Sequence, residues 1–344
     1  MQKYSLVTVN HAEPLRFVGA LCQDYLLRER SNQSTDSAPR FRYPALFLAI
    51  TFLLLAGCSS VPSDKLSAFS TGVTTAKGQV NTAFAAVNVV TADEVIEFAA
   101  NQQKLLDENF YAVLDPAAIA KWNAAFDGLS KYSQSLVVLT SPDITKDYKT
   151  ATAGLASQIS ETGDKLNKAG LTSSAPSLSP GVATAFAELG NLILKAKASK
   201  DAKTIVQKTD PTVARIFHTM ADSVDTIRGT VHANWTSKKK HKAAEFNPKA
   251  PEADRKKVAL EYSDLKDKEA EQDSALASLQ RSLLALADAH HALARDSQYD
   301  VVAAVAVVKD EAKDTKDIYD QMKKALDKTS SEKSAAATTS TTNE

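Results

Sequence analysis

Residues 258–293 read VALEYSDLKDKEAEQDSALASLQRSLLALADAHHAL, and this stretch decides the fold class. Its mostly apolar positions recur at alternating steps of four and three residues, which places them on one stripe of an α-helix that packs along its length. Two polar residues, Glu269 and Gln272, lie in the middle of the stripe, and we expect them to be exposed or paired, because an unpaired polar group in a core is unfavourable. The stripe comprises Val258, Tyr262, Leu265, Glu269, Gln272, Leu276, Leu279, Leu283, Leu286, His290 and Leu293.

Similar spacing fills the chain between its breaks and predicts seven helical segments, whereas strand-like alternation is absent over any useful length. Four dipeptides match a helix start, in which a Ser or Asp cap precedes a first-turn proline. They are Asp115-Pro116, Ser141-Pro142, Ser179-Pro180 and Asp210-Pro211. The predicted segments cover 63–113, 116–139, 144–166, 180–196 with an extension towards 206, 211–231, 251–296 and 301–326.

The sequence therefore predicts an all-α protein, an elongated antiparallel bundle of about five to seven long helices with coiled-coil-like packing. At about 1.5 Å per residue, a helix over 251–296 would be roughly 70 Å long. We place the bundle domain at 64–328, with sub-boundaries at 171–179 and 247–251, and expect the Ser/Thr/Ala-rich tail at 329–344 to be disordered.

Composition excludes several classes of protein. The 344 residues contain 41 Lys+Arg, 41 Asp+Glu and only 2 cysteines, and 44% of them are hydrophobic. These values exclude a collagen-like repeat, a disulfide scaffold and a wholly disordered chain. The neutral balance creates no global field that would attract nucleic acid, so we expect no nucleic-acid partner.

One strong motif lies near the N-terminus. Residues 44–56 carry no charge and follow Arg40 and Arg42 closely. The run is shorter than the roughly 20 apolar residues of a membrane-spanning helix but fits the core of a secretion signal, about 7–15 residues. The sequence that follows is Leu55-Ala56-Gly57-Cys58-Ser59-Ser60. In these residues the chain resembles the bacterial lipoproteins, whose lipobox has Leu, two small residues and an obligatory Cys.

The resemblance implies a lipid anchor. Cys58 would receive a diacylglyceryl group on sulfur, the bond between Gly57 and Cys58 would be cleaved, and the freed amine would be acylated, so that membrane lipid holds the protein. Ser59 favours the outer membrane, and residues 58–63 would form a tether. Residues 1–57 would be an extension plus signal peptide, and because a leader has roughly 15–30 residues, we expect translation to start beyond 1–39.

Candidate sites in the mature chain are weak. No two histidines have the three- or four-residue spacing of a helical metal pair, so we predict no metal and no cofactor. No nucleophile elbow, phosphate loop or glycine-rich nucleotide turn occurs, so we predict that the protein is not an enzyme. The adjacent residues His290 and His291 point about 100° apart on a helix, which predicts that one faces the core and the other water.

A basic run near Trp235 is the most distinctive local feature. It would contact anionic lipid headgroups or another polyanion, or else charge the C-terminal end of the fifth helix favourably, and we favour the second interpretation. The run comprises Lys238, Lys239, Lys240 and Lys242. The wholly apolar residues 301–308 are too short to cross a membrane, which favours a buried helix segment over an inserting hairpin.

The sequence thus predicts a lipid-anchored envelope protein, a non-enzymatic structural or interaction module on the periplasmic side of the outer membrane with an envelope protein as its partner. Two alternatives stay open. One is a membrane-active, pore-forming-like helical protein, and the other is a periplasmic binding protein for a small ligand or metal, with a polar pocket around His290, Glu269 and Gln272.

Overall fold

A computed structural model describes residues 61–102, 114–140, 147–169, 177–196, 201–295 and 298–340. The chain divides into two compact units, Met1–Cys58 and Ser59–Glu344, and every described residue belongs to the second. The lipobox residues Leu55, Ala56, Gly57 and Cys58 lie outside the described residues.

The described residues form seven α-helices and no strand, which confirms the predicted all-α class and the antiparallel packing. Their lengths are uneven, because α6 and α7 have 44 residues each whereas α5 has 17. The helices are α2 (Ser63–Gln102), α3 (Pro116–Leu139), α4 (Tyr148–Ala169), α5 (Pro180–Ala196), α6 (Ala202–Glu245), α7 (Glu252–Arg295) and α8 (Gln298–Ser340).

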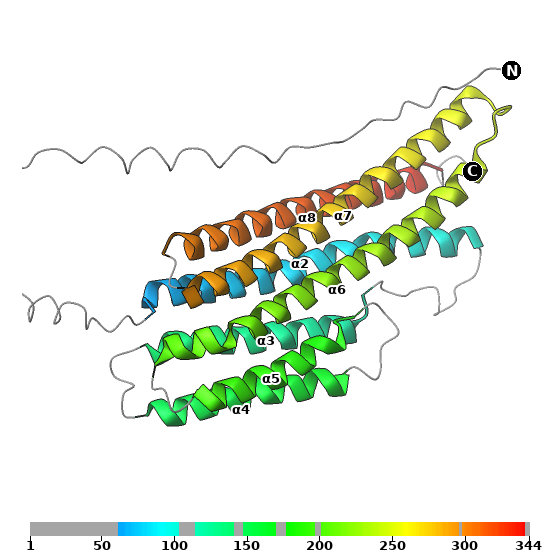
Figure 1. Cartoon of the computed structure of the whole chain (residues 1–344). Coiled ribbons are helices and arrows are strands. Elements are labelled where there is room, and N and C mark those ends of the chain that lie inside the picture. The colour runs from blue at the N-terminus through cyan, green and yellow to red at the C-terminus, as the bar shows by residue number, and fades with distance from the viewer. Residues whose placement is uncertain are drawn as a thin grey trace, which may run out of the picture. The chain divides into compact units, whose positions relative to one another are not determined.

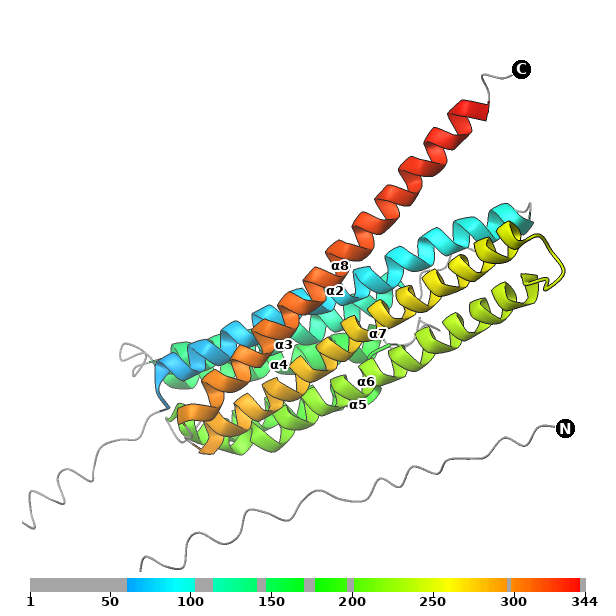
Figure 2. The same ribbon diagram turned by 90° about the horizontal axis from the view of Figure 1, so that it is seen from above.

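The helices pack in a closed order. Each helix packs on the one that follows it in the chain, α8 returns to pack on α2, and α7 also contacts α2 (Figures 1 and 2). Successive helices run in opposite directions, and because there are seven of them, α8 runs the same way as α2, on which it packs. The start of α2 therefore lies at the same end of the bundle as the starts of α4, α6 and α8.

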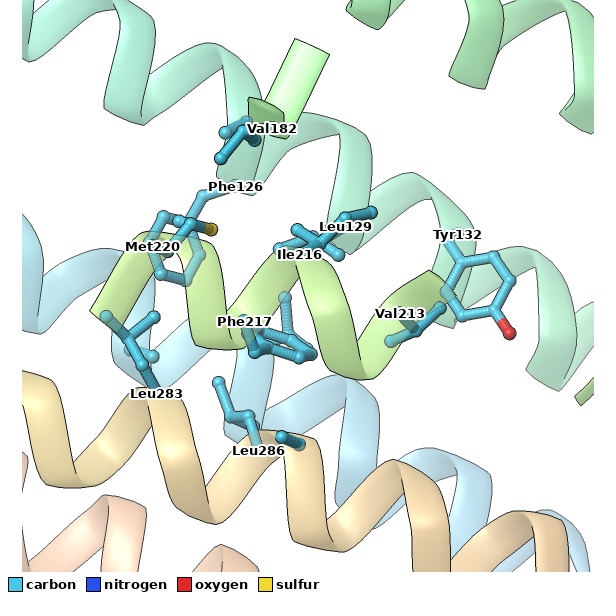
Figure 3. Close-up of a cluster of buried hydrophobic side chains, with 14 of the residues drawn as sticks. Phe126, Leu129, Tyr132, Val182, Val213, Ile216, Phe217, Met220, Leu283 and Leu286 are labelled. Carbon is cyan, nitrogen blue, oxygen red and sulfur yellow. The ribbon is translucent and has the colours of Figure 1, made fainter. Parts of the chain in front are cut away.

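One continuous core joins these helices. In Figure 3, Ile216 of α6 lies on the side towards Leu129 of α3, and Phe217 lies on the side towards Leu286 of α7. Phe69 of α2 meets Phe217 edge to face, with ring centroids 6.4 Å apart. The core is continuous across the predicted sub-boundary at 247–251, which is the turn between α6 and α7.

Two predicted helix starts are confirmed by their capping bonds. The backbone N–H of Ala118 donates to Asp115 Oδ1 at 2.6 Å, with Pro116 in the first helical position. The hydroxyl of Ser179 accepts from the N–H of Gly181 at 3.3 Å, and α5 begins at Pro180. In both cases the proline lacks only a donor that a helix start does not use.

The predicted start at Asp210-Pro211 is wrong. Helix α6 begins at Ala202, capped by Asp201, whose carboxylate accepts from the N–H of Lys203 at 2.9 Å, and Pro211 lies inside the helix. An internal proline costs about 3 kcal/mol. Burial of Ile205 and Val206 in the turns before it offsets that cost, because these side chains join the common core only if the helix continues through Pro211.

Two observations concern the ends of the predicted bundle domain. Val61 is 1% exposed, so the core begins inside the segment that we expected to be a tether. Helix α8 continues to Ser340, past the predicted start of the disordered tail at 329. Three successive alanines at 335–337 favour helix there, because alanine has the highest helix propensity.

Candidate functional site

A buried chain of hydrogen bonds links three helices, α3, α6 and α7. Tyr132 of α3 and His290 of α7 are both fully excluded from solvent, and the Tyr132 hydroxyl lies 2.8 Å from Nε2 of His290. Nδ1 of His290 lies 3.0 Å from Oδ1 of Asp210 on α6. The Tyr132 hydroxyl also lies 2.7 Å from Oγ1 of Thr209, the residue before Asp210.

The protonation states follow from the surroundings of each group. Burial lowers the pKa of His290 in spite of its bond to Asp210, so the ring is neutral at pH 7. Burial opposes ionisation of Asp210, but its hydrogen bonds to His290 and His291 outweigh burial and lower the pKa of Asp210, so the carboxylate is charged. Burial raises the pKa of Tyr132, which stays a phenol. A neutral His290 therefore donates a hydrogen bond from Nδ1 to Asp210 and accepts one at Nε2 from the Tyr132 hydroxyl.

His291 completes the arrangement from the adjacent position on α7. Its Nδ1 lies 2.7 Å from Oδ2 of Asp210, so the two oxygens of one carboxylate serve two neighbouring histidines. The His291 side chain is 45% exposed, whereas that of His290 is 0% exposed. The predicted division, with one histidine inward and one outward, is confirmed.

This Tyr–His–Asp order is chemically a proton relay, but its position makes it a structural joint. Phe69 packs edge-on against the His290 ring at 5.4 Å between centroids, and Tyr132 and Thr209 are 0% exposed. A substrate cannot reach a hydroxyl that the core covers on every side. The three groups instead fix α3, α6 and α7 to one another through bonds that are strong in a low-dielectric interior.

A second buried joint lies further along the same face of α7. The Trp235 indole on α6 donates to Gln272 Oε1 at 2.7 Å, and the Gln272 amide donates to the backbone carbonyls of Ala86 and Val87 on α2 at 3.3 and 3.0 Å. Gln272 is 2% exposed, so the polar residue in the apolar stripe is paired, as predicted.

The other polar residue of the stripe, Glu269, is paired as well. Its carboxylate contacts His232 Nδ1 at 2.9 Å and also binds the Lys239 ammonium. The side chain of Glu269 is 15% exposed. Both predictions for the mid-stripe residues are therefore confirmed.

The predicted ligand pocket around His290, Glu269 and Gln272 is wrong. These residues share one stripe of α7, but Gln272 and His290 are eighteen residues apart, which is about 27 Å along a helix. Each belongs to a different joint with different partners. A common stripe places side chains on one face of a helix without bringing them together along its axis.

The lysines of the basic run are engaged within the α6–α7 hairpin to different degrees. Lys239 binds Glu269, and Lys242 binds Glu245 and Glu261 at 2.8 and 3.0 Å. The Lys238 ammonium lies 4.7 Å from the Trp235 ring centroid, in a cation–π contact. Lys240 is exposed. Acidic residues of the two helices thus neutralise part of the positive charge of the basic run.

The apolar residues 301–308 form part of α8. Val301, Val305 and Val308 are buried on one stripe, whereas Val302 and Val307 are 60% and 43% exposed. Among the described helices, none carries an apolar stretch long enough to cross a membrane. Within the described ranges, no group of three or more His, Cys, Asp or Glu side chains is arranged to hold a metal ion.

Comparison of the chain with models of protein families, with curated proteins and with solved structures finds no match.

The partners of His290 were not predicted from the sequence. Nothing in the sequence around Tyr132 distinguishes it from other residues of its helix, and Asp210-Pro211 has the composition of a helix start. One signal was available, because the stripe of α6 continues backwards from Val213 through Thr209 and Val206 at helical spacing, across Pro211. That continuity turns Asp210 from a cap into a residue of the helix interior.

Proposed function

We propose that the chain is a lipid-anchored protein of the bacterial cell envelope, whose helical bundle is a non-enzymatic structural or protein-interaction module on the periplasmic side of the outer membrane. The observation that carries the proposal is the position of the motif Leu55-Ala56-Gly57-Cys58. It ends three residues before Val61, the first buried residue of the bundle.

This spacing has a mechanical consequence. Three residues span at most about 10 Å of extended chain. An acylated Cys58 would therefore hold the end of the bundle at which α2 begins close to the bilayer surface. Two or three acyl chains on one residue make a durable anchor, since each buried methylene contributes about 0.8 kcal/mol.

The opposite end of the bundle would then face the periplasm. Helix α6 starts at the anchored end, and its 44 residues extend about 66 Å before the turn into α7. The first turns of α7 after this point are exposed and strongly charged, from Glu252 to Lys257. Such a surface suits contact with another envelope protein, because charged rims set orientation and rate of encounter.

A pair of cysteine substitutions tests the anchor. Cys58→Ala should abolish labelling by a fatty-acid probe and move the protein out of the membrane fraction. Cys22→Ala removes the other cysteine of the sequence and should leave labelling unchanged. Ser59→Asp should keep the label but retain the protein in the inner membrane. Persistent labelling of Cys58→Ala would refute the anchor.

Photo-crosslinking in native envelopes tests the interaction module. A crosslinker at Leu260, which is 61% exposed near the α6–α7 turn, should give a discrete protein adduct. A crosslinker at Leu194, which is 51% exposed near the end of α5 and so at the proposed membrane end, is the matched control. Equal, diffuse labelling from both positions would count against an interaction site at the turn.

A further inference from the structure

A small pocket lies where the start of α3, the last turn of α4 and the start of α5 meet. Its polar lining consists of Lys121, Asn167, Ser177 and Ser179, and apolar side chains of α4 and α5 complete the wall. The space that water-sized molecules can occupy in it is about 70 Å³, and the pocket is partly open to solvent. The pocket is at the end of the bundle opposite the start of α2.

Lys121 is the unusual member of this lining. It is 3% exposed, and among the described residues its ammonium makes no hydrogen bond or ion pair. Lysines are almost never so deeply buried unless they are paired, because an isolated charge loses its hydration without compensation. The lysines Lys239 and Lys242 are more exposed and nevertheless have carboxylate partners.

The groups around Lys121 suit an anion. The described lining residues include no carboxylate that could neutralise the lysine. Ser177 and Ser179 offer hydroxyl donors, and the N-terminus of α5 adds the positive end of its helix dipole. Ser179 is held in place, since its N–H donates to Ser223 Oγ at 3.1 Å while its hydroxyl accepts from Gly181.

We propose that this pocket binds the oxyanion of a small solute, a phosphate or carboxylate group, with the Lys121 ammonium as its counter-charge and the serine hydroxyls as additional donors. A bound anion supplies the charge that the buried lysine lacks. The pocket admits the anionic group and a few atoms attached to it. The site is independent of the lipid anchor, so either proposal can fail alone.

The thermal midpoint of the full chain in the presence of two probes, inorganic phosphate and acetate, tests the site. At ten times the Kd, and at ionic strength matched with chloride, the probe should raise the midpoint by roughly 2–4 °C. Phosphate also stabilises proteins generally by exclusion from their surface. The shift in thermal midpoint of a variant without the Lys121 charge therefore sets the baseline. Lys121→Met keeps the stem and removes the charge, and should lose the excess response to both probes.

The variant also separates a binding lysine from a structural one. Lys121→Met should fold in chloride alone, because it keeps the buried stem of the side chain, and Lys121→Arg should keep the response to the anion. A stronger response to phosphate than to acetate assigns the phosphate group, and the reverse assigns the carboxylate. Equal responses of the wild-type chain and Lys121→Met to each probe would overturn the proposal.

A measurement on the wild-type chain decides the matter even if Lys121→Met does not fold. Phosphate at constant ionic strength should protect Lys121 from an amine-modifying reagent several-fold, as read by mass spectrometry. Lys131 is exposed on the same helix and is the internal control. Unchanged modification of Lys121 in phosphate would overturn the site.

Discussion

The α4–α5 pair and the α6–α7 pair are both antiparallel helix pairs, yet different contacts hold them together. Gly163 and Gly190 let α4 and α5 approach until backbone meets backbone, and a Cβ at either position would lie 3.0 Å from a carbonyl oxygen, that of Ala183 or Ala156. The α6–α7 pair is instead joined by polar contacts, from Asp210 with His290 to Trp235 with Gln272.

The difference follows from helix length. The 22 residues of α4 and 17 of α5 pack through small residues over a short distance. The 44-residue helices α6 and α7 extend beyond the reach of α5, and their exposed ends have fewer apolar neighbours. Directional polar bonds then fix the register of the long pair, which apolar contact alone specifies weakly.

The largest effect should come from the buried joint of the long pair. Asp210→Ala leaves His290 and His291 without their acceptor and should lower the free energy of unfolding by about 3 kcal/mol. Asp273→Ala removes the exposed carboxylate that pairs with Arg228 in the same helix pair, and should cost no more than about 1 kcal/mol. Urea unfolding of both variants measures the difference. Equal losses would show that burial does not distinguish the two contacts.

The close approach of the short pair should be the next most sensitive feature. Gly190→Ala places a methyl group against the Ala156 carbonyl and should destabilise the protein by about 1–3 kcal/mol. Gly229→Ala lies on α6 with no atom within 4 Å of the added carbon, and should stabilise it by about 0.5–1 kcal/mol. Thermal and urea unfolding would check both signs. A stabilising Gly190→Ala would mean that α4 and α5 have room to separate.

Acid should weaken the long pair through His290. Its pKa is lower in the folded chain than the ordinary value of about 6.5, so the unfolded chain binds more protons as pH falls below that value. Stability should therefore fall below about pH 6.5, by up to 1.4 kcal/mol per pH unit, until the folded pKa is reached.

His290→Gln provides the control for this pH dependence. This variant should be less stable at pH 7.5 but should lose less stability between pH 7.5 and 5.5. The pKa of Asp210 is lowered by folding, so its carboxylate contributes fully to the free energy of unfolding above the unfolded pKa of about 3.9. This contribution is lost only below that pH, outside the range of the comparison. An identical pH slope in the variant and the wild-type chain would assign the effect to other groups.

The smallest effect should come from the solvent-facing ion pairs near the α6–α7 turn. Lys242→Ala removes the contacts with Glu245 and Glu261 and should cost less than about 1 kcal/mol in low salt. The loss should shrink in 1 M NaCl, where the screening length is about 3 Å. If the loss in free energy of unfolding were as large in 1 M NaCl, the Lys242 contacts would be shielded from solvent, as the Asp210 and Gln272 contacts are.

Several features were predictable from sequence because they depend on local spacing. The helical period, the caps at Asp115 and Ser179, and the opposite directions of His290 and His291 all arise within one or two turns of helix. The need of Gln272 for a partner was equally clear, because its stripe is otherwise apolar. The identity of that partner was not, because Trp235 and Ala86 lie 37 and 186 residues away in the chain.

Two other features, the course of α6 through Pro211 and the burial of Lys121, could not be predicted from local spacing because they depend on helices far apart in the chain. Asp210-Pro211 has the composition of a helix start, and only the burial of the preceding turn against other helices explains why α6 runs through it. Lys121 looks like any surface lysine on a helix, and its burial depends on where the ends of α4 and α5 fall.

Two properties follow from the residue pattern alone, namely that the chain is helical and which stripe of each helix is apolar, because they depend on side chains three and four positions apart. Tertiary structure alone decided that α8 closes the order of helices on α2, that Asp210 holds two histidines, and that Lys121 is buried beside a pocket. These outcomes depend on distances between atoms on different helices, which a one-dimensional pattern does not contain.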